Sequence, residues 1–316
     1  MRRSWLPGIL RPDFTWPTAI APTIARTTPS TPAVTSRNVR RFWGFVLEAL
    51  RRFSEHYCSY FDIPFGPSVF DLPFGLVLKR SERVRIEEAM AMQMARAAGM
   101  PVPKVICYGE NPRSTFSFSI LMTRLPGFEL QNVADESLFE AWVEGSWVSD
   151  LAKCLEAMRS WKSPYGEDRI CSPIGTSIRS SRVPSHTMGP FNNEREMHQY
   201  LLPPASSRGF ISEEEIQQCL ALAKEIQSMN HRMVFTHGDF KLHNILIDED
   251  GNLAGFLDWE SAGWCPEHWE FCTAMRFGQG SFWYHLSSKL GGNRYLSELL
   301  CDKSLNRLTV DSYIGF

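Results

Sequence analysis

The chain has 316 residues, of which 43% are hydrophobic and 22% are charged. This length and apolar content are enough to bury a substantial core, and they favour one large domain or two lobes. The formal net charge of −2 gives no overall basic field, and no apolar run reaches the ~18 residues that cross a bilayer, so neither nucleic acid nor a membrane is an expected partner.

The first 40 residues differ in composition from the rest of the chain. Residues 1–41 contain seven arginines and one acidic residue, Asp13, and residues 17–36 are rich in proline, serine and threonine. This bias is typical of a mitochondrial transit segment, although the prolines would interrupt the amphipathic helix that such a segment needs. We therefore favour a disordered tail over residues 1–40 and keep a targeting segment as the alternative.

The eight cysteines give a second indication of location. They are scattered along the chain, and no two of them have C-x-x-C spacing. Reduced thiols in an intracellular protein fit this pattern best. We expect a cytoplasmic protein, with mitochondrial targeting by the arginine-rich N-terminus as the alternative location.

Residues 41–125 are expected to form a small lobe that is rich in β-structure. Apolar residues recur at steps of three and four over 42–53, which predicts a helix. Residues 66–79 have the pattern of short strands broken by prolines and a glycine, and they end in a buried run and a lysine. A second helix is predicted over 84–99, where a glycine followed by prolines ends it. Residues 118–122 are predicted to form a further strand.

Residues 126–316 are expected to form a larger lobe that is mainly helical. A long amphipathic helix is predicted over 136–160, followed by a loop over 162–195 that is rich in serine, proline and glycine. A further helix is predicted over 212–230. Two strand-like runs within 245–257 are joined through an Asp-Gly pair, which signals a hairpin, and helical sequence rich in aromatic residues follows. The order of elements predicts an α+β fold with two lobes.

The residues best suited to chemistry surround this hairpin. Asp239 lies five residues before Asn244, and Asp258 lies fourteen residues after Asn244, at the far end of the hairpin. Phosphoryl transfer needs a carboxylate that orients the attacking hydroxyl or accepts its proton, and it needs hard oxygen ligands for Mg²⁺. Taken singly, these residue types most often cap turns. Their combination and spacing favour a catalytic loop in which Asp239 is the base and the other two residues are metal ligands.

A second signal is the lysine that ends the buried strand. A lysine in this position can bind the phosphates of ATP when a carboxylate from the next helix holds it. Glu88 is the expected partner of Lys79, with Glu87 as the alternate. Without the Asp239 motif, an exposed surface lysine would be the better interpretation. Lys241 could offer a charge to the transferring phosphoryl group, and a solvated lysine is an equally good interpretation of it.

The sequence around these residues resembles a known family. Residues 237–246 have the form H-G-D-x₄-N-I-L, and Asp-Trp-Glu follows at 258–260. This pattern resembles the aminoglycoside phosphotransferase and choline kinase-like group, and more narrowly its fungal members, in which Asp-Trp-Glu replaces the Asp-Phe-Gly of protein kinases. Segments within 101–130 and 262–270 resemble the same family, and the resemblance covers about residues 66–275.

The resemblance implies a kinase-like fold with two lobes, Mg²⁺ and ATP as cofactors, and a small molecule with a hydroxyl group as the acceptor. It gives Asp239 the role of base, and Asn244 and Asp258 that of Mg²⁺ ligands. It also implies that Lys79 contacts ATP and that a hinge at 122–125 binds the adenine. The hinge candidates are Met122, Thr123 and Leu125.

The chain also departs from the pattern of kinases. No G-x-G-x-x-G loop precedes Lys79, and only 46 residues follow Glu270. A catalytically weak, kinase-like nucleotide-binding module therefore stays as the alternative, although the retained acidic set argues against it. A protein kinase is the weakest interpretation, because Asp-Phe-Gly is absent and the segment between Asp258 and Pro266 is too short to dock a peptide.

Two further groups of residues give weaker signals. The histidines and cysteines within 237–272 fit no closed zinc-site spacing, so His237 is expected to be a structural residue that steadies the loop. A cationic acceptor would need an acidic pocket. The sequence offers only isolated candidates for it, which are Glu298, Asp302 and Asp311.

Overall fold

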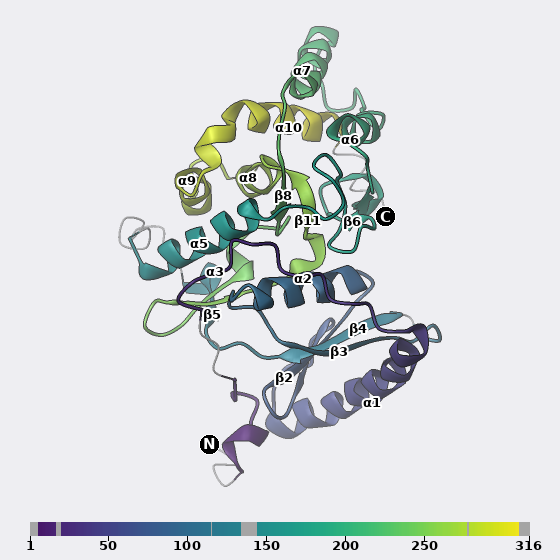
Figure 1. Cartoon of the computed structure of the whole chain (residues 1–316), viewed down its shortest axis with the longest axis vertical. Coiled ribbons are helices and arrows are strands. Elements are labelled where there is room, and N and C mark those ends of the chain that lie inside the picture. The colour runs from purple at the N-terminus through teal and green to yellow at the C-terminus, as the bar shows by residue number, and fades with distance from the viewer. Residues whose placement is uncertain (1–5, 17–19, 115, 134–143, 277, 310–316) are drawn as a thin grey trace.

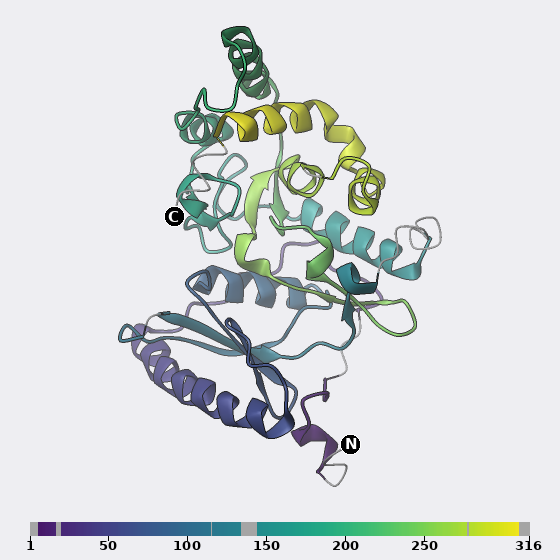
Figure 2. The ribbon, with the colours of Figure 1, turned by 180° about the vertical axis from the view of Figure 1, so that it is seen from behind.

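The computed structural model describes residues 6–16, 20–114, 116–133, 144–276 and 278–309. These residues form two lobes stacked along the long axis of the molecule (Figure 1). One lobe carries a β-sheet between two helices, and the other is mainly helical (Figure 2). The predicted α+β architecture with two lobes is thus confirmed. No helix among the described residues is long and apolar enough to cross a membrane.

The N-terminal lobe is built on an antiparallel sheet of four strands in the order β1-β2-β4-β3. Helix α1 (Arg37–Phe61) packs on one face of this sheet, and α2 (Ile86–Ala97) lies on the other face, between the sheet and the C-terminal lobe (Figure 1). A leucine from α1, Leu47, shares a buried cluster with Leu78 and Leu121 of the sheet. The strands are β1 (Val69–Leu72), β2 (Leu76–Arg80), β3 (Val105–Glu110) and β4 (Phe118–Thr123).

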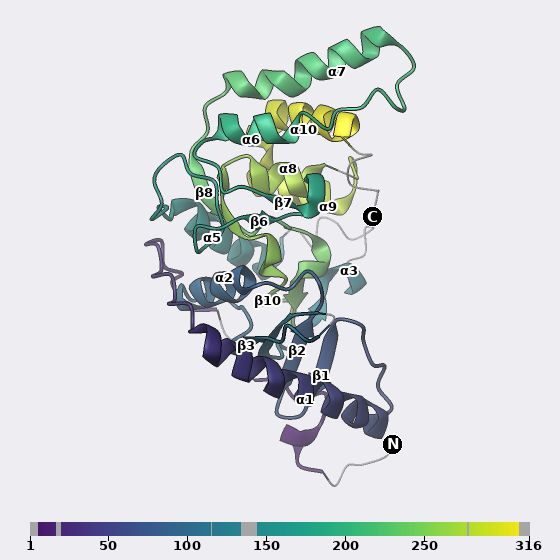
Figure 3. The same ribbon diagram turned by 90° about the vertical axis from the view of Figure 1, so that its right-hand side faces the viewer.

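The C-terminal lobe consists mainly of helices. Helix α7 lies at the end of this lobe that is farthest from the N-terminal lobe (Figure 3). The helix expected over 136–160 is present as α5, and its expected start at 136–143 lies outside the described residues. The helices are α3 (Leu130–Val133), α5 (Ser146–Ser160), α6 (Glu194–Leu201), α7 (Glu213–Glu225), α8 (Trp269–Met275), α9 (Phe282–Lys289) and α10 (Leu296–Thr309).

Short strands and turns complete this lobe. The predicted hairpin is present as β9 (Ile245–Ile247) and β10 (Leu253–Phe256), and β5 (Phe128–Glu129) adds a third strand. A separate pair, β8 (Met233–Thr236) with β11 (Gly263–Pro266), was not predicted from the sequence. The remaining elements of this lobe are β6 (Ile178–Arg179), β7 (Thr187–Met188), η3 (Pro184–His186), η4 (Ile226–Ser228), η5 (Leu242–Asn244), η6 (Trp259–Ser261) and η7 (Gly292–Tyr295). The short helix η1 (Gly8–Leu10) lies against the N-terminal lobe, where the carbonyl oxygen of Ile9 accepts the backbone N–H of Phe74 at 2.7 Å.

The N-terminal segment differs from the disordered tail expected over residues 1–40. The backbone N–H of Ala25 donates to the carbonyl oxygen of Ala98 at 2.9 Å, and the indole N–H of Trp161 donates to the carbonyl oxygen of Ala25 at 2.9 Å. Because Ala98 follows α2 and Trp161 follows α5, the segment bridges the two lobes. Ile24 is buried in the main core. The structure thus corrects the expected disorder for residues 20–36, and the targeting role stays a prediction.

Substitution of Ile24 tests whether this segment is docked. Only 7% of Ile24 is exposed, so we expect Ile24→Ala to lower the free energy of unfolding by about 2 kcal/mol. The variant should also be cleaved faster by trypsin after Arg26 or Arg37. Chemical denaturation and limited proteolysis measure these effects. Val34→Ala is the matched control, because 43% of Val34 is exposed and its loss should change stability by less than about 0.5 kcal/mol.

Candidate active site

The loop between β8 and β9 carries Asp239 and Asn244, two of the predicted site residues. Its backbone is held by a glutamate of α8. The buried Glu270 carboxylate accepts the backbone N–H groups of His237 and Gly238 at 2.5 and 3.0 Å. Gly238 has a φ of +80°, and a Cβ there would lie 2.2 Å from the carbonyl oxygen of Ser261. The tight turn therefore requires glycine.

Replacement of Glu270 tests this support. Glutamine would offer one acceptor oxygen and would turn its NH₂ group toward the second backbone N–H, so one buried donor would lose its partner. We expect Glu270→Gln to lower the free energy of unfolding by about 1–3 kcal/mol, as measured by urea denaturation. Glu225→Gln, at an exposed position, is the matched control. Equal stability of the Glu270→Gln variant and the wild type would contradict a role in holding the loop.

His237 is a buried structural residue, as the sequence indicated. Its Nε2–H donates to the carbonyl oxygen of Leu257 at 2.7 Å, and its Nδ1 accepts the backbone N–H of Asp239 at 3.3 Å. The ring stacks on Phe256 with the ring centroids 4.2 Å apart. Burial lowers the pKa of His237 to about 4, so the ring is neutral and can both donate and accept. It ties the loop to the end of the hairpin.

Asp239, Lys241 and Asn244 lie together in this loop. The Asn244 Nδ2 group donates to the backbone carbonyl of Asp239 at 2.7 Å and to its Oδ2 at 3.3 Å. The Lys241 ammonium lies 2.6 Å from the other carboxylate oxygen of Asp239. The Asp239 side chain is therefore held from two sides. The amide nitrogen of Asn244 makes these bonds, which leaves its amide oxygen for other partners.

On the other side of the cleft, Lys79 bridges two carboxylates. Residues alternate between the two faces of β2, so Leu78 packs in the cluster under α1 while Lys79 faces α2 and the C-terminal lobe. Its Nζ lies 2.6 Å from Glu88 Oε1 and 2.6 Å from Asp258 Oδ1. Burial alone would lower the pKa of Lys79, but the charges of Glu88 and Asp258 raise it overall. The pair of Lys79 with Glu88, expected from the sequence, is thus present.

Asp258 has an unusual backbone at the end of the hairpin. Its φ of 60° and ψ of 64° are left-handed, a conformation that costs about 1–3 kcal/mol for a residue other than glycine. Burial works against ionisation of this carboxyl, but Lys79 lowers its pKa overall. Carboxylate oxygens of Asp258, Glu88 and Glu260 lie within 4.8 Å of one another. Such hard oxygen donors, with the amide oxygen of Asn244 from the loop, fit the ligands that Mg²⁺ prefers.

Glu260 was not assigned a role from the sequence. It is buried, and its Oε1 accepts the Nε–H of Arg83 at 2.9 Å, while the Nε of Arg179 lies 3.6 Å away. Burial alone would lower the pKa of Arg83, but Glu260, with smaller contributions from Asp258 and Asp239, raises it overall. This arginine therefore stays charged and adds positive charge beside the acidic set. The signal that could have found it is the Asp-Trp-Glu motif at 258–260, of which Glu260 is the last residue.

A cleft of about 650 Å³ lies between the lobes and joins these groups. Asp239 and Lys241 do not line it, but Asp239 contacts Asn244, which does. The apolar part of the cleft includes Val77 and Met92. Thr123, one of the predicted hinge residues, accepts the backbone N–H of Lys104 on its Oγ1 at 2.9 Å. The predicted site residues that line the cleft are Lys79, Glu88, Met122, Thr123, Leu125, Asn244 and Asp258.

The turn between β1 and β2 lies where kinases carry a glycine-rich loop over the phosphates. Among the described residues, no strand precedes β1, and α1 packs against the face of the sheet opposite to α2. The β1–β2 turn is tight, with positive φ at Phe74 and Gly75. The indole N–H of Trp16 donates to the carbonyl oxygen of Phe74 at 2.8 Å. The N-terminal segment thus covers the turn, in which no glycine-rich loop occurs.

Two lobes, a lysine–glutamate pair on one side of a cleft and an aspartate loop on the other define a kinase-like protein. Residues 75–287 match the model of the family described as "APH: Phosphotransferase enzyme family". The chain belongs to this family and is a phosphotransferase, as the motif predicted. No curated protein matches the chain significantly in sequence.

Solved structures show the same fold at low sequence identity. Aminoglycoside phosphotransferase APH(4)-Ia has a TM-score of 0.55 and 15% identity, over 83% of this chain and 92% of that chain. A ternary complex of a thermostable mutant of that enzyme with AMP-PNP and hygromycin B has a TM-score of 0.53 and 15% identity, over 80% and 94% of the two chains. The GDP complex of a mutant aminoglycoside 2′-phosphotransferase-IIIa has a TM-score of 0.52 and 11% identity, over 82% and 88%.

Proposed function

We propose that the protein transfers the γ-phosphoryl group of ATP, with Mg²⁺, to a hydroxyl group of a small molecule. The observation that carries this proposal is that groups from both lobes, Lys79 and Glu88 on one side and Asn244 and Asp258 on the other, line one cleft. Lys79 contacts Asp258 at 2.6 Å, and Asn244 contacts Asp239 at 3.3 Å. Each group has a function that phosphoryl transfer requires.

Lys79 and the hinge would bind the nucleotide. The apolar part of the cleft, with Met122 and Leu125 among its lining residues, would accept the adenine. Lys79, oriented by Glu88, would bind the phosphates. This requires the Lys79 ammonium to exchange one of its two carboxylate contacts for phosphate oxygens. Glu88 is the contact that would remain, because its side chain is 1% exposed while that of Asp258 is 28% exposed.

Asn244 and Asp258 would hold Mg²⁺. The bound ion would neutralise charge on the phosphates. Asp239 would orient the acceptor hydroxyl and take its proton, and the bonds from Asn244 and Lys241 fix its carboxylate for this task. The Lys241 side chain is 39% exposed, so it has room to turn toward the transferring phosphoryl group.

The acceptor in this proposal is a small molecule. Aminoglycosides are one class to test, since the structurally similar APH(4)-Ia mutant was solved with hygromycin B. The acidic candidates from the sequence give little support for a cationic acceptor. The Asp302 carboxylate is paired with Arg182 and Arg276, and Glu298 contacts His231. Asp311 lies outside the described residues.

Titration calorimetry with ATP, with and without Mg²⁺, tests the donor half of the proposal. Mg²⁺-dependent binding is the expected result, and a screen for ADP release with hydroxylated small molecules would follow. The competing function is a kinase-like binding module without turnover, which the missing glycine-rich loop favours. ATP binding without turnover of any acceptor and without slow ATP hydrolysis would favour the binding module. If the protein did not bind ATP at all, both the phosphotransferase and the binding module would be contradicted.

A further inference from the structure

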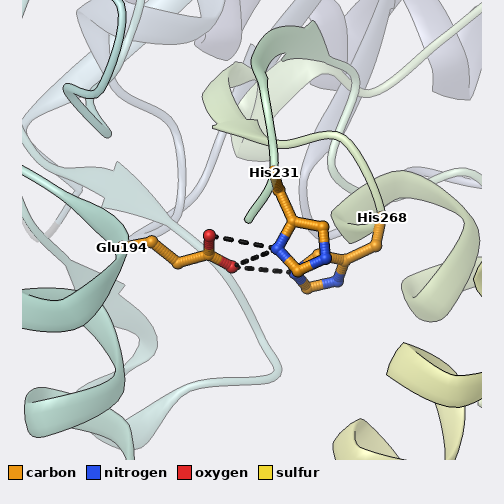
Figure 4. A group of neighbouring side chains, drawn as sticks. All are labelled: Glu194, His231 and His268. Carbon is orange, nitrogen blue, oxygen red and sulfur yellow. Dashed lines mark hydrogen bonds and ion pairs between the residues drawn. The ribbon is translucent and has the colours of Figure 1, made fainter. Parts of the chain in front are cut away.

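A cluster of histidine and glutamate side chains lies in the C-terminal lobe, outside the cleft. Glu194 is the first residue of α6, His231 precedes β8, and His268 caps the N-terminus of α8. Figure 4 shows the two rings side by side and the carboxylate of Glu194 directed at both. One nitrogen from each ring and one oxygen from the carboxylate lie within 4.8 Å of one another.

The distances resemble those between ligands of a single metal ion. Glu194 Oε1 lies 2.9 Å from His231 Nδ1 and 3.2 Å from His268 Nε2. Ligand atoms on a tetrahedral zinc ion, with bonds of about 2.0–2.1 Å, lie roughly 3.3 Å apart. His198, one helical turn after Glu194, has its Nε2 at 3.7 Å from the same oxygen. Three imidazole nitrogens thus surround one carboxylate oxygen.

Two of these histidines have buried nitrogens without a hydrogen bond. His198 and His268 are 6% and 2% exposed. Among the described residues, His198 Nε2 and His268 Nδ1 have no hydrogen-bond partner. A buried polar atom without a partner costs about 1–3 kcal/mol. A cation would satisfy His198 Nε2, which already faces Glu194.

His231 carries an outer carboxylate of the kind that orients metal-bound histidines. Its Nδ1 faces Glu194, and its Nε2 lies 3.3 Å from Glu298 Oε1, on α10. A carboxylate at neutral pH only accepts hydrogen bonds, so both ring nitrogens of His231 carry a proton: Nδ1–H donates to Glu194 and Nε2–H donates to Glu298. Metal-bound histidines usually donate their other N–H to a carboxylate in this way. Zinc would replace the proton on Nδ1, which makes Nδ1 the ligand atom and leaves the bond from Nε2–H to Glu298 in place.

From these contacts we propose that Glu194, His231 and His268 form a structural zinc site. His198 is the fourth ligand, which gives a set of three imidazoles and one carboxylate, a donor set that suits Zn²⁺ and excludes Mg²⁺. An open cavity of about 570 Å³, lined by Glu194, His198 and His231, gives the ion a route from solvent.

The ion would stabilise the segments that hold the loop between β8 and β9. It would join α6, β8 and α8, and through Glu298 also α10. His231 lies six residues before His237 in the loop, and His268 lies two residues before Glu270, which holds that loop. The inference does not depend on the proposed acceptor or on ATP, since zinc binding can be measured without either.

Zinc titration of the full chain tests the inference. We expect one Zn²⁺ per chain, bound in the presence of millimolar Mg²⁺, and a rise in melting temperature of about 5 °C when free zinc is a hundredfold above its dissociation constant. His231→Gln and His268→Gln should weaken zinc binding at least tenfold, and His198→Gln should weaken it less. His56→Gln, at an exposed position in α1, and Asp258→Asn, in the cleft, should bind zinc as the wild type does.

X-ray absorption spectroscopy of the zinc-loaded wild type identifies the ligand atoms directly. It therefore tests the proposal even if a variant fails to fold. The expected coordination shell contains three imidazoles and one oxygen. Sulfur in the shell would place the ion at one or more of the eight cysteines and would overturn the proposal. So would the absence of stoichiometric binding, or undiminished binding in folded His231→Gln and His268→Gln; the cluster would then be a hydrogen-bonded network alone.

Discussion

Asp239→Asn is expected to lower kcat by about 10²- to 10⁴-fold, the usual contribution of a positioned general base, and to leave the Kd of Mg²⁺ and ATP nearly unchanged. Asparagine has almost the same shape as aspartate, but it cannot accept the proton of the acceptor hydroxyl. The Kd should hold because Asp239 does not line the cleft. Steady-state ADP release gives kcat, and titration calorimetry gives the Kd.

The fold should tolerate this substitution. The backbone carbonyl of residue 239 still accepts the Asn244 amide, which is the shorter of its two bonds at 2.7 Å. The lost ion pair with Lys241 is partly exposed, so its loss should cost less than about 1 kcal/mol. Asp250→Asn, at an exposed position in the hairpin turn, is the control. Activity of Asp239→Asn equal to that of the wild type would exclude Asp239 as the base.

The grouping of the proposed catalytic residues could be predicted because their spacing is local. Asp239 and Asn244 share one loop, and Asp258 follows one hairpin later, so the backbone alone brings the three together. Lys79 and Glu88 are nine residues apart, on a strand and the next helix, and alternation along β2 fixes the face that the lysine occupies.

The proposed zinc site was not predicted from the sequence, because only Glu194 and His198 are close in the chain and His231 and His268 join them through tertiary packing. Glu194 and His231 are 37 residues apart, and Glu194 and His268 are 74 apart. No short motif can indicate such a set. The expectation from the sequence considered His268 only together with the other histidines and the cysteines within 237–272, and Cys265 and Cys272 are buried thiols in the structure.

Composition misled the expectation for the N-terminal segment in a related way. The high content of proline, serine and threonine predicts disorder, but the segment forms hydrogen bonds with residues far along the chain. Ala25 contacts Ala98 and Trp161, and Thr28 Oγ1 donates to the carbonyl oxygen of Lys162 at 2.9 Å. The short strands β8 and β11 were missed for the same reason, since each is defined by pairing with the other.

Asp258→Asn is expected to remove the Mg²⁺ dependence of ATP binding and to weaken binding at saturating Mg²⁺ at least about 30-fold, which corresponds to about 2 kcal/mol. The amide is a neutral and weaker ligand for a hard cation than the carboxylate. Asparagine is preferred to alanine here because it tolerates the left-handed backbone that residue 258 adopts, with φ of 60°, so the loss can be attributed to the ligand rather than to strain.

Binding of ATP without Mg²⁺ separates the two roles of Asp258. In the structure this carboxylate pairs with Lys79 at 2.6 Å, so it competes with phosphate oxygens for the lysine when no metal is bound. Asp258→Asn weakens that pair, and we expect Mg²⁺-free ATP binding to be unchanged or tighter than in the wild type. Lys79→Met should instead weaken ATP binding with and without Mg²⁺. Calorimetry on the two variants measures both effects. A Mg²⁺ dependence that survives in Asp258→Asn would exclude Asp258 as a metal ligand and would move that role to Glu260 or Glu88, whose oxygens lie within 4.8 Å of it.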